Sequence, residues 1–219
     1  MIKAETFRFL SDLKANNNKD WFESHREQYQ AAKQNVMDFV AELIAGIDDF
    51  DHHLEGLTAA ECVFRIYRDA RYAKEGAPYK THFGAYIAFG GRNSEYAGYY
   101  FHLAPGDCYI GGGMYSPGIA VLRKIRQEID YNPRPLKRVL KDEGFVKYYG
   151  EIQGEKLDAA PKGFPKDHKD IDLLKLESHF AIHQMRDDEL MQESAVQVVL
   201  ERLSYLYNFN RFFNETFVS

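Results

Sequence analysis

The stretch FGAYIAFGGRNSEYAGYYFHLAPGDCYIGGGM, residues 83–114, decides the fold. It contains three runs rich in aromatic and apolar residues, at 83–90, 96–104 and 107–114, and Gly, Asn, Pro or Asp bounds each of them. Such runs are typical of β-strands. The connection at 90–95 and the very short Pro-Gly-Asp at 105–107 have the composition of hairpin turns. Strands joined by hairpins run antiparallel, so this stretch predicts an antiparallel sheet.

The run 96–104 has one face that differs from the other. Because successive side chains of a strand point to opposite sides, alternate residues share this face, and they are Tyr96, Gly98, Tyr100, His102 and Ala104. A polar and aromatic face that is interrupted by glycine fits the floor of a pocket. It fits equally well a sheet surface that faces solvent, so both interpretations stay open.

Two more strands and several helices complete the expected architecture. The apolar patterns predict two more strands, at 62–68 and 176–183. They also predict a helix at 4–14, a long helix that follows the asparagines at 16–18 and runs to about Ile47, and further helices from Ser116 and Pro117 onward, at 133–142 and from about 187 to 213. Ser116 is expected to cap its helix and Pro117 to be the first helical residue. We therefore predict an α+β fold in one domain over 1–219: a mainly antiparallel central sheet packed by N-terminal and C-terminal helices.

The segment RIYRDARYAKEGAPYKT, residues 65–81, is where the chemistry of the sequence predicts a functional site. It holds five cations and two acids, whereas the whole chain has a formal net charge of −5. The residues before it are apolar, so the cations are expected to begin on a buried strand and continue into a loop. Charge in such a place is costly unless it is paired or bound. Either carboxylates such as Asp69 satisfy these cations, or an anionic ligand does.

The ligand hypothesis gives each residue a role. Arg65 or Arg68, together with Arg71, would clamp a phosphate or carboxylate, because guanidinium groups match two oxygens at once. Lys80 would add a point charge or donate a proton. Tyr79 and Tyr100 would contact the substrate, Asp69 would orient an arginine, and His102 would be the general acid–base because its reference pKa is near neutral. No nucleophile and base pair is legible, so the reaction, if there is one, and any cofactor stay unknown.

Three alternatives stand beside this hypothesis. In the first, an Arg–Asp–Tyr network merely fastens 65–81 to the sheet. In the second, the cations of 65–80 and of 123–141 form a nucleic-acid surface with tyrosines as stacking platforms; the net charge of −5 and the absence of a known motif argue against it. In the third, the long helices are partner surfaces, although their apolar stripes are explained more simply as core.

Composition narrows the compartment and the chemistry. The N-terminus has no signal-peptide pattern, and no apolar run approaches the roughly 20 residues that span a membrane. The two cysteines, Cys62 and Cys108, are interpreted as small buried residues of a reducing cytoplasm.

Histidine pairs offer little support for a metal. His52 and His53 are adjacent, and adjacent side chains point apart. Asp167 and His168 fit a helix cap better than a catalytic dyad. If 176–183 is a strand, His179 and His183 share a face but lie roughly 13 Å apart. No metal site is predicted.

Several strings of residues together resemble one family. They are NNKDWFESHREQY at 17–29, RIYRDARYAKEGAPYKT at 65–81, YYFHLAPG at 99–106, GGGMYSP at 111–117 and PKGFPKDH at 161–168. Over nearly its full length the chain resembles the bacterial and fungal family called domain of unknown function 2461. It departs from the family pattern at Tyr72 and at 73–76, which weakens any role for Lys74. The resemblance implies an intracellular protein and names no reaction.

Overall fold

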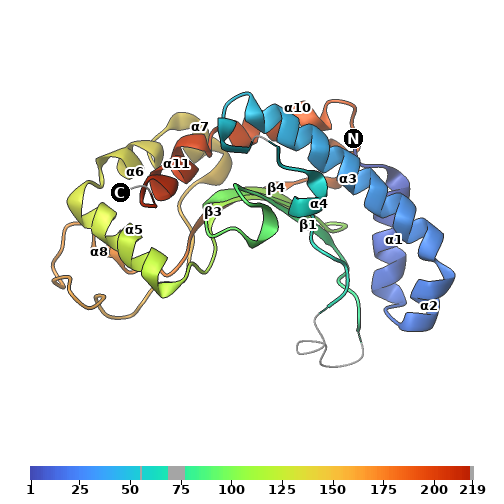
Figure 1. Ribbon diagram of the computed structural model, residues 1–219, viewed down its shortest axis with the longest axis horizontal. Helices are drawn as coiled ribbons and strands as arrows, with labels where there is room; N and C mark the ends of the chain where they lie inside the picture. The colour runs from blue at the N-terminus through green and yellow to red at the C-terminus, as the bar shows by residue number, and fades with distance from the viewer. Residues whose placement is uncertain (55, 69–76, 218–219) are drawn as a thin grey trace.

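An antiparallel sheet lies at the centre of the computed structural model, which describes residues 1–54, 56–68 and 77–217 (Figure 1). Its strands are β1 (Phe83–Ile87), β2 (Gly98–Leu103), β3 (Cys108–Met114) and β4 (His179–Met185). They lie side by side in the order β1-β2-β3-β4, and every neighbouring pair is antiparallel. With the helices around it, this sheet makes the fold α+β, as the hairpin pattern of 83–114 predicted.

Helices precede the sheet, follow β3 and end the described chain. Their bounds are α1 (Ala4–Ala15), α2 (Lys19–Ser24), α3 (Arg26–Asp48), η1 (His52–Leu54), α4 (Ala59–Cys62), η2 (Gly91–Asn93), α5 (Ile119–Tyr131), α6 (Arg134–Val139), α7 (Glu143–Tyr149), α8 (Ile171–Leu174), α9 (Asp187–Leu190), α10 (Ala195–Ser204) and α11 (Tyr207–Glu215). The break between α1 and α2 is fixed by Asn18, whose side chain accepts a hydrogen bond from the backbone N–H of Trp21. This is the N-cap that asparagine is suited to provide.

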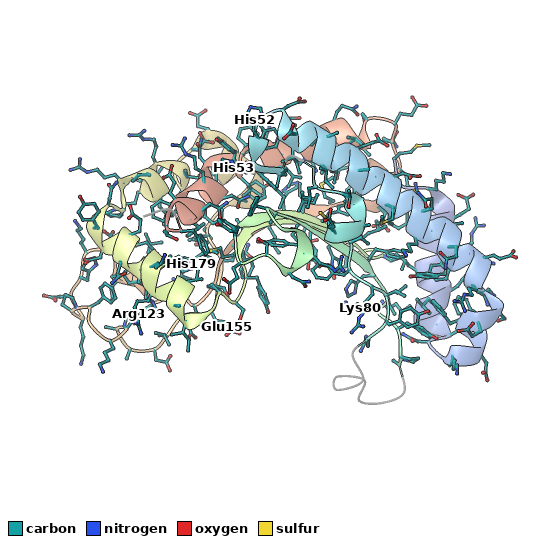
Figure 2. The ribbon with its side chains drawn as sticks, in the orientation of Figure 1. His52, His53, Lys80, Arg123, Glu155 and His179 are labelled. Carbon is teal, nitrogen blue, oxygen red and sulfur yellow. The ribbon has the colours of Figure 1, made fainter. Side chains whose placement is uncertain are left out.

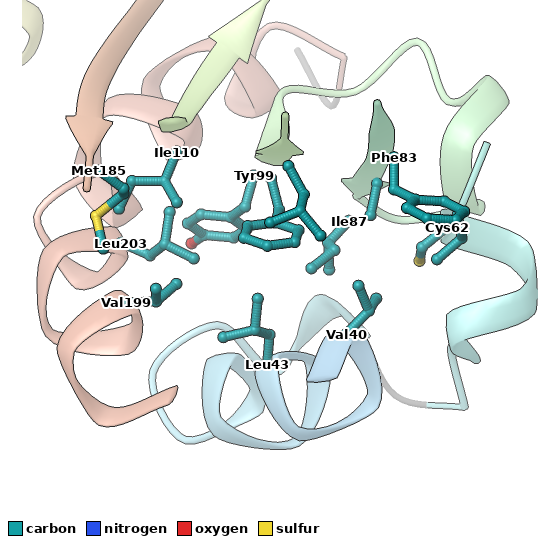
Figure 3. Packing of buried hydrophobic residues seen from close by; sticks show 14 of the residues in the cluster. Val40, Leu43, Cys62, Phe83, Ile87, Tyr99, Ile110, Met185, Val199 and Leu203 are labelled. Atoms are coloured by element: carbon teal, nitrogen blue, oxygen red, sulfur yellow. The ribbon is translucent and has the colours of Figure 1, made fainter. Parts of the chain in front are cut away.

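One face of the sheet carries the core. Tyr99 and Phe101 of β2 and Ile110 of β3 point to this face, and all three are buried. Opposite them lie apolar residues of α3 and α10, among which Figure 3 shows Val40, Leu43, Val199 and Leu203. In Figure 1, α3 and α10 run along this side of the sheet. The buried stripe of α3 recurs at helical spacing, which is why one side of this long helix faces the sheet.

Both edges of the sheet make contacts beyond the strands. At the β1 edge, Val63 forms an isolated bridge with Ala85, and the backbone N–H of Phe64 donates to the carbonyl of Gly84 at 2.9 Å. At the β4 edge, Gln153 and Phe180 exchange two backbone hydrogen bonds, of 2.7 and 3.1 Å. The long connection around 150–168 therefore covers part of the edge of β4.

The segment 62–68 is not the strand that its apolar pattern predicted. A capping box between Thr58 and Glu61 starts the short helix α4, which takes up Cys62. Beyond it, only the isolated bridges at Val63 and Tyr67 remain. The other expected strands are present with shifted ends: β4, for example, spans 179–185 rather than 176–183.

Two helix predictions also need correction. The helix after β3 starts at Ile119 with Gly118 as N-cap, because Ser116 has a positive φ of 49° and its backbone N–H donates instead to the Ser178 hydroxyl. The expected final helix over 187–213 is interrupted after Leu190 and after Ser204, so it forms α9, α10 and α11. These changes of direction bring both α10 and α11 against β3.

Cys62 and Cys108 are both buried and unpaired. Burial raises the pKa of each thiol to about 12, so neither is a thiolate at neutral pH. In the part of the chain that the structure describes, none of the helices has the length and apolar character needed to cross a membrane.

Candidate functional site

The face of the sheet turned away from α3 and α10 is the floor of a cleft of about 740 Å³. Its lining comes from the segment before β1, the turn around η2, the floor strands and the start of α5. The lining residues are Phe64, Lys80, His82, Gly84, Tyr86, Arg92, Ser94, Glu95, Tyr96, Tyr100, Tyr109, Gly111, Gly112, Gly113, Met114, Tyr115, Ser116, Pro117, Gly118, Val121, Phe180 and Ile182.

The register of the strands sets the floor. Tyr86 lies opposite Tyr100, Tyr100 opposite Gly111, and Gly111 opposite Ile182. Residues paired in this way share a face, so these four form a row across the sheet. The Tyr86 hydroxyl donates to the carbonyl of Tyr96 at 2.7 Å. Of the two interpretations of the 96–104 face, the structure therefore shows the pocket floor.

Tyr100 connects the cleft to two histidines. Its hydroxyl lies 3.1 Å from Nδ1 of His102. The His102 ring stacks on Tyr109, with centroids 4.4 Å apart and planes at 10°, and its centroid is also 4.4 Å from that of His82. His82 and Tyr109 line the cleft, whereas His102 is buried and does not. The expected general acid–base thus faces neighbouring rings rather than the open volume.

Burial keeps these groups neutral near pH 7. It lowers the pKa of His82 to about 4, with the nearby His102 and Lys80 acting in the same direction. It also lowers the pKa of His102, although Asp107 opposes the change. Burial raises the pKa of the Tyr100 hydroxyl. The floor therefore offers neutral hydrogen-bonding groups, and the charged groups of the cleft lie outside the floor.

One of these charged groups is Lys80, which reaches the cleft from a two-stranded ribbon. The backbone N–H of Lys80 donates to Ile66 at 2.7 Å, and that of Arg68 donates to Pro78 at 3.0 Å, so 63–68 and 77–80 run antiparallel. The Lys80 ammonium lies 5.5 Å from the centroid of the Phe64 ring. Figure 2 shows Lys80 below the sheet, on the side away from α3.

Two like charges lie near Lys80 among the described residues. Burial lowers its pKa, and the positive charges of Arg65 and Arg68 lower it further. Among the described residues, no Asp or Glu forms an ion pair with any of these three cations. Arg65 and Arg68 are exposed and lie beside the cleft rather than in its lining. Three described cations therefore lie in or beside one corner of the cleft.

Tyr79 does not face the cleft. Its ring is buried and stacks on Phe22, with centroids 3.9 Å apart and planes at 12°. Asn17 holds the same residue by its backbone: its side chain donates to the carbonyl of Tyr79 at 2.9 Å and accepts from its N–H at 3.1 Å. Tyr79 is therefore an anchor for Lys80, its neighbour in the chain, and not a contact for a ligand in the cleft.

This anchor can be tested. In Asn17→Ala the backbone N–H of Tyr79 loses its partner, and we expect the free energy of unfolding to fall by about 1–3 kcal/mol. The adjacent Asn16 is a matched control, because its side chain donates at the exposed end of α1 to Asp12. Asn16→Ala should cost less than about 1 kcal/mol. Urea denaturation of both variants makes the comparison, and equal losses would show that the link to Tyr79 does not hold the ribbon.

The remaining predicted residues have different outcomes. Asp69 and Arg71 lie outside the described residues. His179 is buried on β4, on the face opposite the cleft. His168 lies 3.0 Å from Asp130, not paired with its neighbour in sequence. His53 is exposed and lies 3.2 Å from Asp51. Within the described ranges, no three His, Cys, Asp or Glu side chains gather as a metal site requires.

Several lining residues escaped sequence reasoning. His82 and Tyr109 carry the polar cluster around Tyr100, and Arg92 lines the cleft while donating to the carbonyls of Ala60 and Glu61. The signal for Tyr109 was present in the alternation of 107–114. It becomes readable only when the register places Tyr109 opposite His102. Nothing comparable pointed to Arg92, whose position depends on the turn at η2.

Known proteins offer one match and two negative results. The comparison with curated proteins finds no match, and the comparison with solved structures finds none either. The family whose description is "Conserved hypothetical protein (DUF2461)" matches residues 5–212, which include the ribbon, the sheet and the whole lining of the cleft. The chain belongs to this family.

Proposed function

We propose that the cleft binds a small molecule that bears a phosphate or carboxylate group. The observation that carries the proposal is Lys80: it is partly buried, it lines the cleft, and the described charges that act on its pKa are the two arginines Arg65 and Arg68. Partly buried positive charge that forms no ion pair with a described carboxylate gains from a bound anion. A bound anion would relieve the mutual repulsion of Lys80, Arg65 and Arg68.

The floor supports the same proposal. The hydroxyls of Tyr100 and Tyr109 and the ring of His82 face or border the open volume and stay uncharged. Such groups orient a ligand without adding to its electrostatic attraction. If the site is catalytic, His82 is better placed than His102 to exchange a proton with the occupant, because His82 lines the cleft directly.

Removal of the Lys80 charge should weaken anion binding. We expect inorganic phosphate, pyrophosphate or citrate to raise the thermal midpoint of the natural chain, and Lys80→Gln to lose about ten- to a hundredfold in affinity, the usual worth of a charge-assisted hydrogen bond. Calorimetric titration of both proteins gives the affinities.

Lys33→Gln is the matched control for this experiment. It removes the same charge from an exposed position on α3, which covers the opposite face of the sheet. It should bind the anions as the natural chain does. If Lys33→Gln weakens binding as much as Lys80→Gln, the effect is one of overall charge and not of the cleft. If no anion of the panel binds, the proposed function fails.

Salt dependence separates this proposal from nucleic-acid binding. A surface that contacts many phosphates loses affinity steeply as salt rises. A cleft that holds one anionic group should respond much less. The observation that favours a small molecule is that the cations lie at one corner of a cleft. Such a corner contacts few of the phosphates of a polymer.

A further inference from the structure

The two ends of the cleft differ in chemistry. Lys80 and His82 stand just before β1, at the end of the floor where Gly84 lies opposite His102. Tyr115 and Pro117 follow β3, at the other end, where Gly113 lies opposite Phe180. Since β2 lies between β1 and β3, these two pairs of residues are separated not only along the strands but also across them, by two strand spacings or roughly 10 Å. They therefore occupy diagonally opposite corners of the floor.

The corner opposite Lys80 is apolar and partly uncovered. The Tyr115 side chain is 81% exposed, and its ring meets that of Phe180 edge to face with centroids 5.7 Å apart. Ile119, in the first turn of α5 and four residues further along the chain, is 82% exposed. Val121 and Ile182 extend the apolar lining inward. Large apolar side chains gathered at the rim of a cleft are a common sign of a ligand or partner that covers them.

Between the corners the floor is formed by Tyr100 together with Gly84, Gly111 and Gly113. A Cβ added at Gly84 would meet the Tyr100 hydroxyl, and one added at Gly111 would meet the Ile182 side chain, so an elongated occupant meets Tyr100 and Ile182 there. The Tyr100 hydroxyl is turned toward His102. Between the two corners, the described lining contains no acidic side chain that would repel an anion. Glu95, the one acidic residue of the described lining, lies on the turn around η2.

We infer that the occupant is an amphiphile, with its anionic group at Lys80 and a planar apolar body against Tyr115 and Phe180. This inference rests on the proposed function, because it takes the anion at Lys80 as given. It adds the class of molecule: not a free phosphate or a short dicarboxylate, but an aryl or similarly flat apolar group joined to the anion by a linker that crosses the floor of the cleft.

Three probes separate the two halves of the ligand. 4-Phenylbutyl phosphate carries both the ring and the anion, butyl phosphate lacks the ring, and 4-phenylbutanol lacks the anion. We expect the first to bind the natural chain at least about tenfold more tightly than the second, the usual effect of burying a ring of this size. Lys80→Gln should weaken both phosphates by a similar factor. Calorimetry or equilibrium dialysis provides the dissociation constants.

Tyr115→Ala tests the apolar corner, and Tyr131→Ala is its control. Both side chains are strongly exposed, at 81% and 87%, but Tyr131 ends α5 and does not line the cleft. Tyr115→Ala should remove most of the tenfold advantage and leave the affinity for butyl phosphate unchanged. Tyr131→Ala should alter neither.

The outcomes keep the inference distinct from the proposed function. Equal affinities of the natural chain for the two phosphates would overturn the amphiphile and leave the anion site in place. Binding of 4-phenylbutanol as tight as that of its phosphate would overturn both proposals, since the charge would then contribute nothing. If no probe binds, both proposals fail. A ring advantage that survives Tyr115→Ala places the apolar body elsewhere and also contradicts the inference.

Discussion

We expect Gly113→Ala to lower the free energy of unfolding by about 2–5 kcal/mol, enough to remove much of the stability of an ordinary domain. Gly113 has a φ of +108°, a region that residues with a Cβ rarely adopt. A Cβ built there would collide with the backbone oxygen of His179 and lie 2.8 Å from the Cα of Phe180. Strain in the backbone and a clash with β4 therefore act together.

Two other glycines separate these causes. Gly106 also has a positive φ, of 76°, but an added Cβ meets nothing within 4 Å, so Gly106→Ala should show the conformational cost alone. Gly118 has a φ of −59° and open space around it, so Gly118→Ala should cost less than about 1 kcal/mol. Urea denaturation ranks the three variants. If Gly113→Ala is no worse than Gly106→Ala, β4 yields to the methyl group and the close approach of the strands is not a constraint.

The second large effect is loss of stability in acid through His179. This ring is fully buried on the helix-covered face of β4, 5.3 Å from the centroid of Phe213. Burial lowers its pKa to about 4, and the charge of Arg126 acts in the same direction. Unfolded histidine has a pKa near 6.5. Between these values the unfolded chain binds a proton that the folded chain does not, so stability falls as the pH falls from about 6.5 to 4.

The size of this loss follows from the difference in pKa. About 2.5 units correspond to roughly 3 kcal/mol, reached near pH 4 and constant below it for this group. His179→Gln cannot bind the proton, so its free energy of unfolding should change by about 3 kcal/mol less than that of the natural chain between pH 7 and pH 4. Carboxylates contribute to both proteins alike, and the difference between the two profiles isolates His179. Parallel profiles would mean that the ring is protonated inside the fold.

The sheet was predictable because its signals are local. Alternating residues and short turns over 83–114 placed three strands and their antiparallel order, and the buried stripe of α3 was legible at helical spacing. The prediction of a strand at 62–68 was wrong because an apolar run fits both a strand and the end of a short helix such as α4. Here the capping box between Thr58 and Glu61, which lies outside the run, favours the helix.

The site was predictable only in part, for a related reason. Lys80 and Tyr100 could be assigned from charge and alternation, and both line the cleft. The side to which Tyr79 turns depends on Phe22 and Asn17, which are more than fifty residues away in sequence. The importance of His82 comes from the contact of its ring with that of His102, which exists only after β1 and β2 pair. Long-range pairing of this kind leaves no local pattern.

The contacts along the two borders of the sheet bear on how the protein behaves when it is concentrated. An outermost strand with free N–H and carbonyl groups can recruit the same strand of a second molecule and start a growing aggregate. Here Val63 and Phe64 occupy part of one border, and Gln153 occupies part of the other. Copies that meet sideways find these groups already engaged, which makes edge-to-edge extension of the sheet unfavourable at those positions.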